Sequence, residues 1–275
     1  MLQRLFLLLI ALGLCACTVR PRGGGSDDDD ASDDDDSARD DDDAADDDDA
    51  ADDDDAADDD DAVDDDDATP PFDLGCAVPT TIDDSIFAIQ NGDTSGLVVL
   101  EGVVVVHVRD NGMFVQEPAA GACSGLWVYT GAAPDAAVGE SWDIEGMVGD
   151  YLGFTEVDAS KGSYTFTGAT PGPPPPSPVS LGWLQPDVAE PWEGVVVSVQ
   201  GVQVSSIPTE ASFWEWEVTD GSAAVVVDDF LFDVTTVRTP EEGDAVVSLI
   251  GIVNYSFEAY KIAPRRPTDV TIVAQ

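Results

Sequence analysis

"VVVVHVRDNGMFVQE", residues 103–117, is the stretch that decides the fold of this chain. Two runs rich in β-branched and aromatic residues flank Asp110-Asn111-Gly112, and an Asn-Gly pair between such runs is the strongest short-range sign of a β-hairpin. Similar runs recur from residue 80 onward, separated by Gly and Pro, and none repeats its apolar residues at the 3.6-residue period of a helix. The pattern predicts an all-β fold.

The sequence of this region also repeats itself. "LEGVVV" at 100–105 returns as "WEGVVV" at 192–197, and "GMVGDYLGFTEV" at 146–157 returns as "GIVNYSFEAYKI" at 251–262. The offset between the copies changes once, inside the first hairpin, which a single insertion explains. We therefore predict a duplicated domain, with a first copy at 76–169 and a second at 181–275. The proline-rich segment 170–180 between them is expected to be a stiff linker.

The N-terminal segment has the layout of a secretory signal peptide, with Arg4 followed by the apolar run 5–14. A run of this length is too short to span a bilayer. Its ending, Leu14-Cys15-Ala16-Cys17, resembles a bacterial lipobox. The resemblance implies a signal peptide at 1–16, a lipid anchor on Cys17, and a place in the bacterial cell envelope, at the outer membrane or cell surface. The alternative is an ordinary signal peptide cleaved after Ala16, which would leave Cys17 unmodified.

Aspartate dominates the next segment. Seven blocks of four aspartates lie between residues 27 and 67. Such blocks repel each other, and the segment has too little apolar content to offset chain entropy. We expect residues 17–75 to be a disordered acidic linker that holds the folded part away from the membrane. A specific calcium site is the alternative, but a flexible repeat offers no preformed cage, so only weak diffuse calcium binding is expected and no cofactor.

The folded part is strongly acidic as well. Residues 69–275 contain 29 acidic and 6 basic residues, a net charge of −23. Nucleic-acid binding usually depends on Lys and Arg side chains that neutralise phosphates. The charge therefore disfavours DNA or RNA as a ligand.

The chain has four cysteines, two of them in the N-terminal segment. In an exported protein the other two, Cys76 and Cys123, should form a disulfide. A metal site would need more ligands than two thiols and the single histidine, His107, provide, so no metal site is expected.

No catalytic motif is evident in the sequence. His107 lies within a predicted strand between Val106 and Val108, which favours a packing or surface role. The acid pairs Asp228-Asp229 and Glu241-Glu242 are expected to be solvated surface in so acidic a chain. The interpretation is a protein that is not an enzyme.

Three motifs point to a particular β fold: "GVVVVHVRDNGMFVQEP", "SGLWVYTG" and "VGESWDIEGMVGDYLGFTEV". Their order resembles the OB-fold repeats that precede the catalytic domain of secreted bacterial nucleases. The resemblance covers roughly residues 80–275 and implies two tandem OB-fold-like five-stranded barrels. The catalytic domain that follows the repeats in that family has no counterpart up to Gln275.

The resemblance also suggests a binding face, because OB-folds usually bind ligands on strands 2 and 3 and the adjoining loops. Alternation along 126–129 places Leu126 and Val128 inside, so that Trp127 and Tyr129 lie on an outer face, beside Met113 and Val115. In the second copy, Trp214 and Trp216 share one face. These four aromatic residues are the candidate ligand-binding residues, for stacking on sugars or bases. Alternatively, the rings cover the barrel or pack between the two domains.

Two functions from different classes follow. The first is a lipid-anchored, non-catalytic module that binds a protein or polysaccharide partner. The second is a nucleic-acid-binding accessory of a separately encoded extracellular nuclease, which would require Arg238, Lys261, Arg265 and Arg266 to form one basic patch.

Overall fold

The computed structural model describes residues 85–207, 215–233, 236 and 238–274. The chain divides into two units, 1–63 and 64–275, and all described residues belong to the second. The predicted anchor Cys17, the aspartate blocks, Cys76 and Trp214 lie outside the described residues. No described helix combines the length and the hydropathy that crossing a membrane requires.

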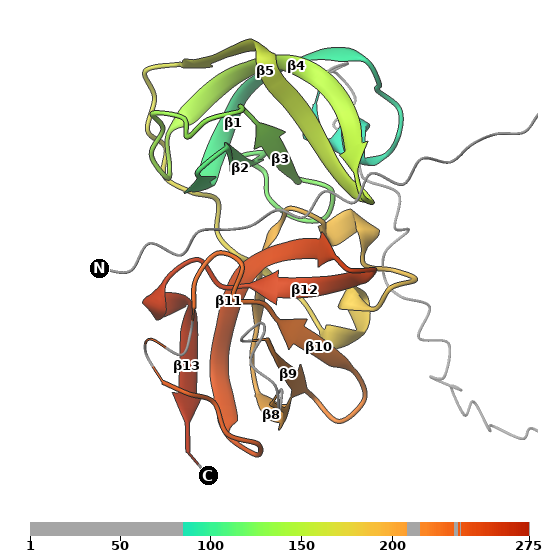
Figure 1. Ribbon diagram of the computed structural model, residues 1–275, viewed down its shortest axis with the longest axis vertical. Helices are drawn as coiled ribbons and strands as arrows, with labels where there is room; N and C mark the ends of the chain where they lie inside the picture. Colours follow the sequence, from blue (N-terminus) through green and yellow to red (C-terminus); the bar gives the residue numbers. More distant parts are fainter. Residues whose placement is uncertain (1–84, 208–214, 234–235, 237, 275) are drawn as a thin grey trace, which may run out of the picture. The chain divides into compact units, whose positions relative to one another are not determined.

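The first half of the described chain is a closed five-stranded barrel, which confirms the predicted all-β class (Figure 1). Its strands follow each other around the barrel in the order β1-β2-β3-β5-β4. All neighbouring pairs are antiparallel except β3 and β5, which run parallel. This is an OB-fold-like arrangement. The strands are β1 (Leu97–Arg109), β2 (Gly112–Gln116), β3 (Gly125–Tyr129), β4 (Ser141–Tyr151) and β5 (Phe154–Phe166).

The hairpin predicted at Asp110-Asn111-Gly112 joins β1 to β2. Arg109 pairs with Gly112, so Asp110 and Asn111 form the turn and Gly112 begins β2. A short helix that the sequence pattern did not reveal, α1 (Ile86–Gln90), packs against the barrel core. Ser85 caps its N-terminus, since the Ser85 hydroxyl accepts a hydrogen bond from the Ala88 N–H at 3.1 Å. Five residues are too few to produce a helical period, so only the cap could have indicated this helix.

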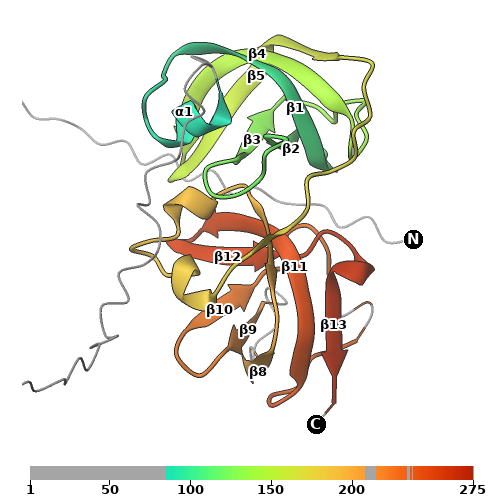
Figure 2. The same cartoon turned by 180° about the vertical axis from the view of Figure 1, so that it is seen from behind.

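The second half is a sheet with the strand order β12-β10-β9-β8-β11-β7-β6. Figure 2 labels β8, β9, β10, β11, β12 and β13 of this half. Strand β12 pairs with β10 in parallel and with β11 in antiparallel orientation, and β13 pairs with β11. The strands are β6 (Ser177–Pro178), β7 (Val196–Val199), β8 (Val202–Ser206), β9 (Trp216–Thr219), β10 (Ala224–Val227), β11 (Ala245–Ser256), β12 (Ala259–Ala263) and β13 (Val270–Val273). The 3₁₀ helices are η1 (Leu181–Leu184), η2 (Glu190–Trp192) and η4 (Pro267–Asp269). Strand β6 lies within the proline-rich segment 170–180, so this segment contributes to the sheet.

Corresponding positions of the two halves share unusual backbone conformations. The turn between β4 and β5 places Leu152 and Gly153 at φ of 57° and 87°, and the turn between β11 and β12 places Phe257 and Glu258 at 52° and 62°. A side chain at Gly146 would collide with Val157, and one at Gly251 would collide with Ile262. All of these residues occupy matching places in the sequence alignment of 146–157 with 251–262.

The two halves contact each other through a small apolar cluster and buried polar bonds. Val106, Phe114 and Phe154 of the barrel pack with Val196 and Ile252 of the second sheet. The Val196 N–H donates to Oε1 of the fully buried Gln116 at 3.0 Å. The outer face of β2 is therefore covered by the second half of the chain.

A second buried polar contact joins the halves at the start of the second one. The Thr155 N–H in β5 donates to Oε1 of Glu193 at 2.6 Å, and the Glu193 side chain has no exposed surface. Close by, the backbone of Gly125 approaches that of Gly194 so closely that a Cβ on Gly125 would lie 2.1 Å from the Gly194 carbonyl carbon. Only glycine allows this approach.

Candidate ligand-binding cleft

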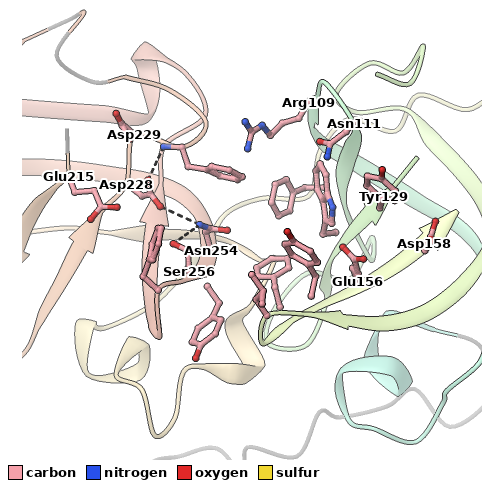
Figure 3. Close-up of a pocket in the computed structure, with 18 residues that line it drawn as sticks. Arg109, Asn111, Tyr129, Glu156, Asp158, Glu215, Asp228, Asp229, Asn254 and Ser256 are labelled. Carbon is pink, nitrogen blue, oxygen red and sulfur yellow. Dashed lines mark hydrogen bonds between the residues drawn. The ribbon is translucent and has the colours of Figure 1, made fainter. Parts of the chain in front are cut away.

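A cleft of about 790 Å³ lies between the barrel and the second sheet, and both contribute side chains to it (Figure 3). This volume is within the range of small-molecule binding pockets. Aromatic rings and carboxylates dominate its walls. The rings are Phe114, Trp127, Tyr129, Tyr151, Phe154, Phe230, Tyr255 and Phe257, the carboxylates are Glu156, Asp158, Glu215, Asp228 and Asp229, and the remaining residues are Arg109, Asn111, Leu152, Asn254 and Ser256.

The barrel wall of the cleft is built by the parallel pair β3 and β5. Trp127 pairs with Glu156, and Tyr129 pairs with Asp158. Residues in register on neighbouring strands share a face of the sheet, and residues two apart on one strand share it too. The wall therefore carries two ring–carboxylate pairs in succession along the strands.

The chemistry of these two carboxylates differs. Partial burial, together with the nearby charges of Asp158 and Asp150, raises the pKa of Glu156 above its ordinary value. Hydrogen bonds from the Ser160 side chain and backbone lower the pKa of Asp158. A positive charge between Glu156 and Asp158 would relieve their mutual repulsion.

The Trp127 ring packs against two other residues of the barrel, Phe114 and Gly112. Its ring lies 4.7 Å from the ring of Phe114, centroid to centroid, at an interplanar angle of 54°. Its six-membered ring also lies over Gly112, where a Cβ would come within 2.5 Å of it. Gly112, the first residue of β2, therefore leaves room for the Trp127 ring.

The opposite wall comes from the loop after β10 and from the end of β11. Asp228 is buried, accepts a hydrogen bond from the Phe230 N–H at 2.9 Å and another from Asn254 Nδ2 at 3.3 Å, and so fixes the loop to β11 (Figure 3). Burial raises the pKa of Asp228, and the nearby Lys261 partly opposes this shift. Asp228 is thus a buried, hydrogen-bonded carboxyl, contrary to the expectation of a solvated acid pair with Asp229.

Two cations of the chain itself lie over rings of this wall. The Arg109 guanidinium carbon is 3.7 Å from the centroid of the Phe230 ring. Lys261 Nζ is 5.2 Å from the centroid of Phe257 and 2.7 Å from Oε1 of Glu215. Both ring distances are within the range of cation–π attraction.

Apolar side chains mark the rim of the cleft. Leu152 and Phe257 occupy the tips of the β4–β5 and β11–β12 turns and are 81% and 83% exposed. Apolar groups that line a cavity and remain this exposed are typical of interaction sites.

The predicted ligand-binding residues fall into three groups. Trp127 and Tyr129 lie in the cleft on the outer face of β3, and Leu126 and Val128 are buried in the barrel core, as alternation predicts. Trp216 does not lie on an outer face: it is 4% exposed and packs in the core of the second sheet. Trp214 is outside the described residues.

The neighbours expected beside Trp127 and Tyr129 differ from those in the structure. Met113 and Val115 point into the barrel core rather than lying beside Trp127, because the register of β2 with β3 pairs Phe114 with Trp127.

Glu241 and Glu242 are exposed, as expected for a solvated pair of acidic side chains.

His107 and Cys123, the other residues singled out in the sequence, do not line the cleft. His107 is partly buried on β1, and burial, followed by the charges of Arg265 and Arg109, lowers its pKa to about 4. Cys123 is fully buried, and since Cys76 lies outside the described residues the disulfide stays a prediction. In the described part of the chain, no three His, Cys, Asp or Glu side chains form a group that could hold a metal ion.

Sequence reasoning did not find the acidic half of the barrel wall or any residue of the opposite wall. Glu156 and Asp158 lie beside Trp127 and Tyr129 because β3 pairs in parallel with β5. This pairing joins parts of the chain that are far apart in sequence. Phe257 matches Leu152 in the repeat, but neither residue was recognisable as part of a site from the sequence. No local pattern distinguishes Phe230 or Tyr255 as cleft residues.

Comparisons with known proteins add little to this geometry. No family model and no curated protein matches the chain. Among solved structures, the p204 HINb domain aligns with 62% of this chain and 93% of its own, at 13% identity and a TM-score of 0.29. A similarity this low supports no inference about what the chain binds.

Proposed function

We propose that this chain is a non-catalytic binding protein of the bacterial cell envelope that uses the aromatic cleft to bind a protein or glycan partner. The observation that carries the proposal is that eight aromatic rings from both halves gather in one open cleft of ligand-binding size. Aromatic faces can stack on sugar rings or on amino-acid side chains, and the carboxylates can accept hydrogen bonds from either ligand.

We further propose that the second sheet is a second OB-fold-like barrel, descended from the same duplicated unit as the first. The support is that β12, β10, β9, β8 and β11 form an unbroken circuit of pairings, since β11 pairs back to β12. The parallel pair β10–β12 corresponds to the parallel pair β3–β5. In this proposal the cleft forms where the two modules meet.

The proposed location in the bacterial cell envelope rests on the N-terminal sequence. A lipid on Cys17 would anchor the protein, the acidic segment 17–75 would act as a spacer, and a Cys76–Cys123 disulfide would attach the spacer to the first module. The stretch 76–169, the segment 170–180 and the stretch 181–275 are the proposed first module, linker and second module.

The alternative, a nucleic-acid-binding accessory of a nuclease, gains little support. Arg238, Lys261, Arg265 and Arg266 were the residues that would have to form a basic patch. Each of them lies within 3.2 Å of a carboxylate oxygen, with Asp269 shared by Arg265 and Arg266. These ion pairs offset much of the positive charge that phosphates would need, although the Arg266 side chain remains 58% exposed.

The Trp127→Ala variant tests the cleft as the binding site. We expect any ligand found in a screen of oligosaccharides and peptides to bind this variant at least about tenfold more weakly, because truncating a central aromatic contact usually costs more than about 1.4 kcal/mol of binding free energy. Affinity would be measured by isothermal titration calorimetry on the full chain. Phe166→Ala removes an exposed ring of β5 that does not line the cleft and should leave affinity unchanged. A ligand that binds Trp127→Ala and the wild type equally would contradict the proposal.

A further inference from the structure

The cleft has a marked excess of negative groups. Five carboxylates line it against a single basic side chain, Arg109, among the described lining residues. That guanidinium already lies on the Phe230 ring. The whole chain carries a formal charge of −47, so the surrounding field concentrates cations and repels anions.

The chain's own cations show how this wall accommodates positive charge. Arg109 and Lys261 each lie over an aromatic ring, at 3.7 and 5.2 Å, and Lys261 also pairs with the Glu215 carboxylate. Ring and carboxylate together are the usual environment of a bound guanidinium or ammonium group. The opposite, barrel wall offers the same combination in Trp127 with Glu156 and Tyr129 with Asp158. No ion pair joins Glu156 or Asp158 to a basic side chain within the described part of the chain.

The spacing of the two pairs selects the shape of the ligand. Trp127 and Tyr129 are two residues apart on one strand, a separation of about 6.6 Å. Side chains two residues apart on an extended peptide have the same separation and the same direction. An extended segment with basic residues at alternate positions would therefore place one cation on each ring–carboxylate pair.

We infer that the barrel wall of the cleft binds an extended basic polypeptide segment, whose alternate lysine or arginine side chains lie on Trp127 and Tyr129 beside Glu156 and Asp158. The inference rests on the proposed function, and it names the partner as a protein rather than a glycan.

The test compares two peptides of equal composition on the full chain, by fluorescence anisotropy at physiological salt. One peptide alternates lysine with serine, and the other has its lysines in one block and its serines in another. We expect the alternating peptide to bind at least about tenfold more tightly to the wild type. This preference should disappear in Trp127→Ala and in Glu156→Gln, and Trp127→Phe should retain much of it.

Matched controls separate the cleft from the aspartate blocks, which also attract lysine. All variants keep these blocks, so binding to them contributes equally in every protein and cancels when the variants are compared. Phe166→Ala and Glu145→Gln, which change an exposed ring and an exposed carboxylate outside the cleft, should behave as the wild type. Circular dichroism would confirm that each variant is folded.

The outcomes distinguish this inference from the proposed function. Equal affinity for both peptides, unchanged by Trp127→Ala, overturns the basic-segment inference. If, in addition, a neutral oligosaccharide binds the wild type and not Trp127→Ala, the cleft is still the binding site and its ligand is a glycan. If no oligosaccharide or peptide distinguishes Trp127→Ala from the wild type, the proposed function fails as well.

Discussion

Replacing Glu193 with glutamine is expected to raise the free energy of unfolding at pH 8 by about 4 kcal/mol and to leave it nearly unchanged at pH 4. Burial, reinforced by the nearby charges of Glu190 and Asp150, raises the pKa of Glu193 from 4.5 to about 8, against the lowering effect of the Thr155 N–H. Between these two pKa values the folded protein holds a proton that the unfolded chain releases. Raising the pH therefore favours unfolding of the wild type, and glutamine removes this penalty while keeping an oxygen for the Thr155 N–H.

The measurement is urea denaturation of wild type and Glu193→Gln from about pH 4 to about pH 9, a range that brackets both pKa values. His107 acts in the opposite direction: its lowered pKa means that stability is present above pH 6.5 and lost as the pH falls toward 4. Because both proteins contain His107, the difference between their curves isolates Glu193. Glu145→Gln, at an exposed carboxylate, should follow the wild type. Parallel curves for Glu193→Gln and wild type across this range would show that folding does not raise the pKa of Glu193.

A methyl group added at Gly125 is expected to destabilise the protein by about 3 kcal/mol, at the upper end of the usual cost of overpacking. The Cβ would lie 2.1 Å from the Gly194 carbonyl carbon and 2.3 Å from the Val195 nitrogen, and both are backbone atoms that cannot turn away. The two halves would have to separate locally. The same displacement would loosen the Val196 to Gln116 hydrogen bond nearby.

Gly149→Ala is the matched control for this prediction. Gly149 lies in β4, has no atom within 4 Å of the position that a Cβ would occupy, and should accept alanine within about 0.5 kcal/mol. Thermal denaturation of both variants, followed by tryptophan fluorescence, provides the comparison. A Gly125→Ala variant as stable as the wild type would mean that the halves do not pack as closely as the structure indicates.

The hairpin and the inward-facing strand residues were predictable because their determinants are local. The β1–β2 turn lies at Asp110-Asn111, within the predicted Asp110-Asn111-Gly112, and alternation correctly separates Leu126 and Val128 from Trp127 and Tyr129. Alternation does not say which face is solvated, however. Trp216 and Val218 share one face of β9, as alternation requires, but that face is the core of the second sheet.

The cleft was not predictable because it depends on contacts between residues far apart in the chain. Trp127 meets Glu156 through a parallel pairing, and it shares a cleft with Phe230 and Tyr255 only because the second sheet packs against the barrel. Glu193 illustrates the same limit. Its counterpart in the repeat, Glu101, is exposed, whereas Glu193 is buried where its carboxylate accepts the Thr155 N–H of β5.

The close backbone contact of Gly125 with Gly194, together with the buried bond between Gln116 and Val196, has a consequence for the thermodynamics of binding. These contacts hold the two walls of the cleft together before a ligand arrives. Binding therefore requires no domain closure and avoids the loss of conformational entropy that closure would bring. Affinity would then be determined mainly by dissociation, and a ligand with the correct spacing would gain residence time rather than a faster encounter.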